Sequence, residues 1–501
     1  MRVGSGLALA CRCLAGGVGV GVLLLWVGAS GCTGAYEGAV RRELATYREH
    51  RPRQPVGVVR QPSQEQAPLT AGVASNSGGG GVPDGRLTSY LARALAREPG
   101  LAAAFARFEA SVARIARARR LPEPTLSFGY FLQSVETRVG PQRARVSIQQ
   151  SLPWPTKFTA GADAASAQAR AAQRRFEALS LGVTAAVAAA YWDLWQVRRT
   201  RVIHRDHLVV LQSLAEAVHG RLATGGASLA EQLQVDLAVA RLEDVIAGLD
   251  EAERSAQARL ELVTGAVGDD MLATADDPPE ACMPALEVDG LRDLAVQHPN
   301  IAVFGLLAQA HQATARVEAA ERLPSFTVGA DWLVTGTAQA SGVEDSGKDA
   351  VMVGLGLRLP IFQGSYGASV AAAEAESRAE RKSQEAAKLA ARAELTQSLA
   401  SLRDAVRRVK LQQRTLLPQA EAVFESVLGA YTAGRGGVAQ LLLAQRDLLE
   451  LHVALQQARA DYARAWARLE FVVGQGLQPA AACAAGTFKQ GEAGAGEDAH
   501  G

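Results

Sequence analysis

The sequence contains the same unit twice, and this internal repeat limits the folds that the chain can adopt. Leu121 and Leu323, 202 residues apart, each begin a Leu-Pro pair that precedes a short alternating strand pattern. At the other end of the unit, LELVTG ending at Gly265 returns as LEFVVG ending at Gly474, 209 residues later. Similarity at a nearly fixed offset is typical of tandem structural units. We therefore predict two repeats, over 86–290 and 291–474.

Each repeat is dominated by sequence that favours very long helices. From Phe158 to Leu222 there is no Pro and there are only three Gly, in a background of strong helix formers. At 1.5 Å per residue this stretch extends about 98 Å if unbroken, which no ordinary globular core requires. We predict one helix before each strand pair (about 101–119 and 299–321) and two antiparallel helices after it (about 158–264 and 366–474). Apolar residues spaced by three and four predict coiled-coil-like packing of the returning helices. These residues are Leu229, Leu233, Leu237, Leu442 and Leu449.

A soluble four-helix bundle would account for the helices but not for the two strand pairs. The predicted hairpins, about 125–152 and 325–359, alternate apolar and polar residues. Their strands, of about nine or ten residues, are long enough to cross a bilayer when tilted, with one face towards lipid and the other towards water. Half-buried soluble strands share this alternation. The membrane interpretation predicts these residues in the membrane strands: Phe128, Tyr130, Val146, Ile148, Val328, Trp332, Val353 and Leu355.

Four strands per chain constrain the assembly. A membrane does not tolerate unpaired strand edges, and four strands are too few to close a barrel around a lumen. A barrel in the membrane must therefore be shared between chains. The turns 135–141 and 336–349 would then be exposed loops, and the Leu-Pro pairs mark the points where strand gives way to helix.

The first 31 residues have the composition of a signal peptide rather than of a folded domain. Two arginines precede the apolar run 14–27, which is short and Gly-rich for a membrane span. The sequence Ala-Ser-Gly-Cys ending at Cys32 resembles the lipobox of bacterial lipoproteins, although Ala29 stands where Leu is usual. Cys32 is therefore our candidate for lipidation; the alternative is an ordinary signal peptidase site. We expect a lipid-anchored tether over 32–85 and a disordered tail over 475–501.

Removal of the signal peptide and lipidation of Cys32 would leave Cys282 and Cys483 as the thiols of the exported chain. Two cysteines exclude a disulfide framework. The sequence leaves open whether they form one bridge or stay unpaired.

An ordered set of motifs across 86–474 resembles the TolC family of outer membrane efflux proteins. The motifs are RLPEPTLSFGY, VSIQQSLPWPTKFTAGADAASAQA, AVAAAYWDLW, LRLPIFQGSYGASVAAAEAE and the segment that runs from AYTAGRGG to LEFVVG. Each is loose by itself. Their order, in two repeats behind a lipobox, makes the resemblance specific.

This resemblance implies a mainly α protein with membrane β-strands. Two tandem repeats of strand, strand, long helix and helix would trimerise into a twelve-stranded β-barrel on a long α-helical periplasmic tunnel. The channel would conduct substrates passively to the exterior from an inner-membrane resistance-nodulation-division transporter and a periplasmic adaptor protein. It would lie in the outer membrane, lipid-anchored, and the WPTKF motif points towards the heavy-metal subgroup. The resemblance implies no cofactor, resident metal or catalytic residue.

The resemblance also places the turns between the long helices at the periplasmic tip, where a gate is expected. Family members often carry acidic residues just after the second turn, but Gln440 and Leu443 stand there in this chain, and Arg435 adds a positive charge. This departure argues against a cation-selective acidic ring. Glu231 in the first repeat would supply a weaker ring or lie on a solvated helix face. The tip and gate candidates are Gly225, Glu231, Gly434, Arg435, Gln440 and Leu443.

Other chemistry receives little support from the sequence. A net charge of +1 gives no indication of a nucleic acid partner. His204 and His207 have a spacing that can bind Zn²⁺, but two ligands do not make a site, and we expect surface histidines. The chain has no nucleophile elbow, metalloprotease pair or nucleotide loop in the required context, so we predict that it is not an enzyme.

Two rival functions remain open. A periplasmic adaptor (membrane fusion) lipoprotein also has a long helical hairpin, but it would have one hairpin flanked by lipoyl-like β modules rather than two repeats. The exit duct of type I protein secretion shares the channel fold. The exported substrate, whether metal ion, drug or protein, is not specified by the sequence.

Overall fold

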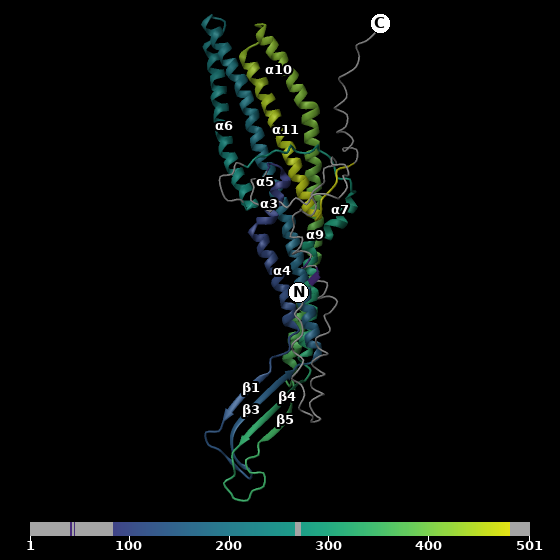
Figure 1. Ribbon diagram of the computed structural model, residues 1–501. Helices are drawn as coiled ribbons and strands as arrows, with labels where there is room; N and C mark the ends of the chain where they lie inside the picture. Colours follow the sequence, from purple (N-terminus) through teal and green to yellow (C-terminus); the bar gives the residue numbers. More distant parts are fainter. Residues whose placement is uncertain (1–40, 43–44, 46–83, 266–271, 481–501) are drawn as a thin grey trace, which may run out of the picture.

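The chain is elongated in this computed structural model, which describes residues 41–42, 45, 84–265 and 272–480 (Figure 1). A small sheet lies at one end and two helical hairpins form the other (Figure 1). The first repeat contains α3 (Leu87–Arg97), α4 (Pro99–Ala118), β1 (Thr125–Tyr130), β2 (Glu136–Thr137), β3 (Gly140–Leu152), α5 (Pro155–Ala223) and α6 (Leu229–Thr264). The second contains α7 (Val288–Val296), α8 (Pro299–Ala320), β4 (Ser325–Thr335), β5 (Ala350–Arg358), α9 (Gln363–Leu411), the π-helix η2 (Gln412–Leu416), α10 (Leu417–Thr432) and α11 (Val438–Val473).

Both repeats follow the predicted order of helix, strand pair, long helix, turn and returning helix, and the two repeats are therefore confirmed. The short helices α3 and α7 at the start of each repeat were not predicted. α5 is one continuous helix of 69 residues. Its counterpart is interrupted, because η2 separates α9 from α10 and Pro418 follows in the first turn of α10. This interruption was not predicted, since a π-helix has no strong local signal in a sequence.

The four main strands form one antiparallel sheet in the order β1-β3-β4-β5, so β1 and β5 are its edges. Cross-strand neighbours bring the predicted membrane residues into rows on one face. One row is Phe128, Val146, Trp332 and Val351; the next is Leu126, Ile148, Ala330 and Val353; a third joins Val328 to Leu355. This apolar face is open to the surroundings of the single chain, with Val353 77% exposed. The period-two pattern therefore describes one continuous apolar surface, as predicted.

α5 is the spine against which both repeats pack, because α4, α6, α8 and α11 all contact it. Near the sheet its buried side chains are small, including Ala160, Ala164 and Ala169, and α8 contributes Ala308 and Ala313 to the same region. Small side chains let helices approach closely. The alanine-rich composition thus explains the narrow bundle next to the strands (Figure 1).

Two larger cores lie halfway along the molecule. The first repeat's core is built from α3, α5 and α6 around Tyr191, Trp192 and Trp195, the aromatic residues of the AVAAAYWDLW motif. Ala460 and Ala463 of α11 complete it. The second core joins α7, α9 and α11. α11 therefore belongs to both cores.

The leucine stripe of α6 does not pack as predicted. Leu229 is 63% exposed, and Leu233 and Leu237 are also exposed, whereas Val235 and Leu242 are buried. A spacing of three and four is shared by two faces of this helix, so periodicity did not identify the buried one. The stripe remains an uncovered apolar surface of the single chain.

The packed chain continues past the predicted end of the second repeat. Ala285 N donates to Gln478 O, and Ala480 N donates to Met283 O, so residues 475–480 are part of the fold rather than the start of a tail. Cys282 beside this pairing is buried and disulfide-bonded. Cys483, the partner that the sequence left open, lies outside the described residues, as do the signal peptide, Cys32 and most of the tether and tail.

Glu470 anchors this C-terminal segment to α11. One of its carboxylate oxygens accepts hydrogen bonds from Trp466 Nε1 (3.1 Å) and from the backbone N–H of Leu477 (3.0 Å). Burial raises the pKa of the Glu470 carboxyl to about 7. The native site therefore holds a proton that an exposed carboxyl would lose near 4.5.

We expect the Glu470 anchor to weaken as pH rises. Between pH 4.5 and about 7 the native carboxyl keeps its proton while the unfolded one loses it, so the local free energy of unfolding falls across this window. Glu470→Gln should abolish that dependence. Amide hydrogen exchange over 470–480, normalised for the intrinsic rate, measures it. Glu450→Gln on an exposed face of α11 is the control, and an unchanged pH dependence in Glu470→Gln would contradict the assignment.

Candidate functional site: tunnel tip and membrane sheet

The two tips use the same backbone turn. Gly225 (φ +76°) and Gly434 (φ +72°) both lie in the left-handed region, where a side chain would be strained. The N–H of the following residue then donates back along the helix, from Gly226 to Arg221 O (2.7 Å) and from Arg435 to Ala430 O (2.8 Å). Both glycines therefore end a helix by a Schellman motif, which is a structural requirement of the turn.

Glu231 caps the helix that begins after the first turn. Ser228 Oγ accepts from Glu231 N, and a Glu231 carboxylate oxygen accepts from Ser228 N (2.7 Å), which is a capping box. The hydrogen bonds from Ser228 hold the pKa of the Glu231 carboxyl below its usual value. The Ser-x-x-Glu spacing was visible in the sequence but went unused. Glu231 thus has a structural role in addition to its charge.

The second tip presents the other gate candidates to solvent. Arg435 is exposed in the turn, and Gln440 and Leu443 are exposed on α11. The same exposed face continues one turn further to Asp447 and then to Glu450. No carboxylate lies beside the turn, but two lie farther along the same exposed face of α11. The spacing of three and four residues that connects them to Leu443 was present in the sequence.

The two tips are joined to each other. Val218 and Val235 of the first repeat form one core with Tyr431, Val438 and Leu441 of the second. The guanidinium of Arg221 lies 5.1 Å from the centre of the Tyr431 ring and also donates to Gly226 O. Neither Arg221 nor Tyr431 was singled out from the sequence, because their contact crosses the repeat boundary.

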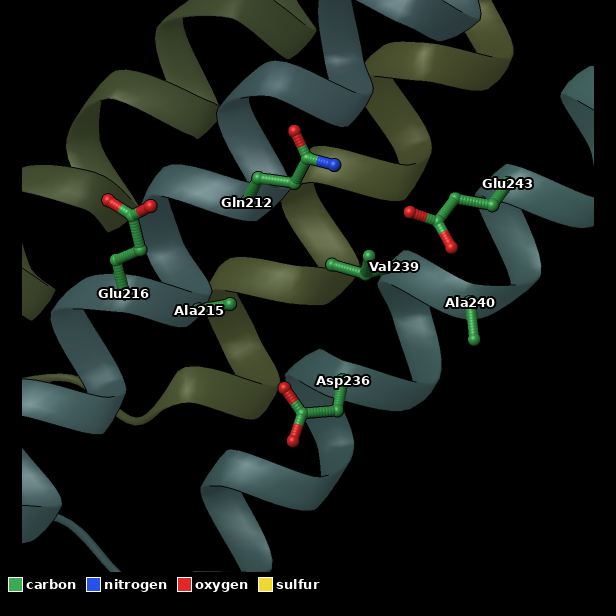
Figure 2. Close-up of a pocket in the computed structure, with 7 residues that line it drawn as sticks. All are labelled: Gln212, Ala215, Glu216, Asp236, Val239, Ala240 and Glu243. Atoms are coloured by element: carbon green, nitrogen blue, oxygen red, sulfur yellow. The ribbon is translucent and has the colours of Figure 1, made fainter.

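A shallow acidic groove of about 410 Å³ lies between α5 and α6, beside this joint. Figure 2 shows Gln212 and Glu216 on α5 and Asp236 and Glu243 on α6 around it, with Val239 between the helices. The corresponding positions of the second repeat, 209 residues later, carry larger apolar groups, since Ala215, Val239 and Ala240 are replaced by Phe424, Leu448 and Leu449. Small side chains therefore leave the first-repeat hairpin less densely packed.

The other face of the sheet is polar and holds an ion pair. Arg145 donates through Nε (3.0 Å) and Nη2 (2.8 Å) to one oxygen of Asp331, which is nearly buried. Ser147 and Gln149 of β3 lie on this face. A sheet with one apolar and one hydrogen-bonded polar face is the arrangement of a barrel wall between lipid and water.

The two histidines of α5 with zinc-compatible spacing, His204 and His207, are not simple surface residues. His204 Nδ1 lies 2.8 Å from Thr200 O, and His207 is half-buried against His452 of α11. Within the described part of the chain, no three His, Cys, Asp or Glu side chains gather as a metal site. α5 is long and apolar enough to cross a membrane by composition, but much of its apolar stretch is buried against other helices.

The comparisons with known proteins agree with this arrangement. The family model of the outer membrane efflux protein matches residues 90–266 and 290–475, which is most of the chain. The chain belongs to the outer membrane efflux protein (TolC) family. It therefore forms an outer membrane channel with a periplasmic tunnel and is not an enzyme. Channels of this family are homotrimers that work with efflux pump partners.

Individual relatives are distant. Protein CyaE of Bordetella pertussis is 29% identical over 383 residues, which cover 74% of this chain and 79% of CyaE. Among solved structures, VceC of Vibrio cholerae has a TM-score of 0.64 at 20% identity and matches 78% of this chain and 97% of VceC. CusC has a TM-score of 0.65 at 17% identity, over 78% of this chain and 92% of CusC. At these identities the structural likeness establishes the fold alone.

Two substitutions separate the cap of α6 from the charge of Glu231. Ser228→Ala should cost about 1 kcal/mol of local stability, because an orphan N–H of the first turn loses its acceptor. Hydrogen exchange over 229–233 should accelerate about fivefold, the equivalent of that free energy. Glu231→Gln should keep this protection, since Gln also serves in a capping box. Accelerated exchange in Glu231→Gln, or unchanged exchange in Ser228→Ala, would contradict the capping box.

Proposed function

We propose that this protein is the trimeric, lipid-anchored exit channel of a tripartite efflux system. It would receive substrate from an inner-membrane resistance-nodulation-division transporter through a periplasmic adaptor protein and release it outside the cell. The channel itself performs no chemistry and holds no cofactor. The energy comes from the inner-membrane partner.

The observation that carries the proposal is the open sheet. β1 and β5 each have an unpaired edge, and the apolar face across the four strands is exposed in the single chain. Further copies that pair β5 of one chain with β1 of the next would close both edges. Three copies give a twelve-stranded barrel, with Phe128, Tyr130 and Trp332 on its lipid face. The exposed leucine stripe of α6 would be covered by the same association.

The tips are the surface available to an adaptor. Both turns lie at the end of the molecule farthest from the sheet (Figure 1). Arg435 is the charged side chain of the second turn, and Gln440 and Leu443 follow it on α11, so the entrance would lack an acidic ring at this level.

Cys32, outside the described residues, is our proposed lipidation site.

Single-channel conductance in a planar lipid bilayer, with crosslinking to count subunits, tests the proposal. We expect stable conductance steps from a trimer. Arg435→Gln should raise the cation over anion permeability ratio, because a positive charge leaves the entrance. Arg254→Gln, far from the tip on α6, is the matched control. A soluble, non-conducting monomer would favour the adaptor alternative.

The choice of partner needs a second measurement. In a strain that lacks its own exit channel, the protein should restore efflux together with a resistance-nodulation-division transporter and its adaptor. Restoration of protein secretion by a type I transporter, without restored efflux, would assign the channel to type I secretion instead. Palmitate labelling of the wild type but not of Cys32→Ser would support the lipid anchor.

A further inference from the structure

Two histidines from different repeats meet in the tip half of the tunnel. His207 Nε2 on α5 lies 3.1 Å from His452 Nδ1 on α11, and the ring centres are 5.3 Å apart. Gln445 Nε2, from a buried side chain, lies 3.0 Å from His207 Nδ1. On the far side, His452 Nε2 lies 3.8 Å from a carboxylate oxygen of Glu421 on α10. The four side chains form one line across three helices.

Neutral rings satisfy both hydrogen bonds at His207. The Gln445 amide donates to His207 Nδ1, which leaves the His207 Nε2–H to donate to His452 Nδ1. The remaining His452 Nε2–H then faces Glu421. Every ring nitrogen has one defined role, and the contact fastens α11 to α5.

The line tolerates one proton but not two. A proton on His452 is balanced by Glu421, and the rings stay bonded if Gln445 turns its amide so that its oxygen accepts from His207. A second proton places two N–H donors opposite each other at 3.1 Å with no acceptor between them. Both rings would then be cationic, and both are half-buried.

The surroundings also oppose charge on His207. Burial lowers the pKa of the His207 imidazole to about 4, helped by His452 and His204, while Asp206 acts in the opposite direction. From the other packed helices, α10 contributes Glu421 beside His452, and the Asp250 carboxylate of α6 is paired with Arg201 and Arg205. Among the described residues, no carboxylate forms an ion pair that would neutralise a charged His207.

The contact has no counterpart at the equivalent positions of the other repeat. At an offset of 209 residues, His207 corresponds to Leu416, and Glu243 and Asp236 correspond to His452 and Gln445. The line also ends beside the interruption of the second repeat, because Glu421 follows η2 and Pro418. A π-helix followed by a residue without an N–H is a point where a helix bends readily.

We propose that the His207–His452 contact is an acid-sensitive clasp between the two repeats, closed while the rings share at most one proton and open when both carry one. Opening loosens the α10–α11 hairpin against α5 at this level and lets α10 bend about 412–418, while the apolar contacts of Val218 with Tyr431 and Val438 still join the tips. The effect of opening on conduction rests on the proposed channel function, whereas the opening of the His207–His452 contact does not depend on it.

Hydrogen exchange at two pH values tests the clasp directly. Between about pH 7.5 and about pH 4, normalised protection over 203–223 and 438–455 should fall about tenfold in the wild-type trimer, relative to the core segment 187–195. His207→Gln, which bonds to both neighbours and takes no proton, should keep its protection at the lower pH. His219→Gln, at an exposed position on the same helix, should behave as the wild type.

His452→Gln provides the same test from the other helix if His207→Gln does not assemble. The clasp is wrong if acid leaves the wild type protected, or if His207→Gln and His452→Gln lose protection as the wild type does. In bilayers, acid should raise the conductance of the wild type and not of the variants. A positive exchange result with no conductance would reject the channel function and leave the clasp intact.

Discussion

A sheet that faces lipid cannot leave its edge N–H and C=O groups unpaired, because hydrocarbon offers them no partner. Four strands with two open edges therefore require other copies of the same chain, and most of the remaining architecture follows from that need. The helices must leave the sheet in a direction that lets neighbouring copies stand side by side, and narrow alanine packing next to the strands allows it. We propose that the exposed leucine stripe of α6 is covered by a neighbouring copy in that assembly.

The two repeats share a plan but have diverged in their use of polar groups. The first repeat leaves an acidic groove between α5 and α6, whereas the second fills the same space with Phe424 and leucines. α5 joins these halves through ionic contacts as well as apolar ones, since Asp193 pairs with Arg464 of α11 on one side and Arg201 with Asp250 of α6 on the other. A single helix thus positions the tunnel lining, the tips and the sheet with respect to each other.

The sequence was sufficient for the fold and insufficient for much of the site. Strand faces, long helices and the repeat follow from periods of two and 3.6 that extend over many residues. The prediction of the buried face of α6 was wrong. Leu233 and Val235 belong to two alternative apolar stripes of one helix, and contact with the neighbouring helix determines which stripe is buried. His207 and His452 are 245 residues apart, so no local pattern could connect them. The capping box of Ser228 and Glu231, by contrast, could have been predicted from the Ser-x-x-Glu spacing alone.

The dual membership of α11 has a consequence for the order in which the chain folds. Ala460 and Ala463 close the core around Tyr191 and Trp192, yet they are made more than 250 residues later. When the ribosome has synthesised the whole first repeat, the core of that repeat is still incomplete. The first repeat cannot finish folding until α11 has been synthesised. Contacts between residues so far apart in the sequence form slowly, and apolar surface stays exposed until they form. A chain built this way depends on being held unfolded and soluble until its synthesis and export are complete.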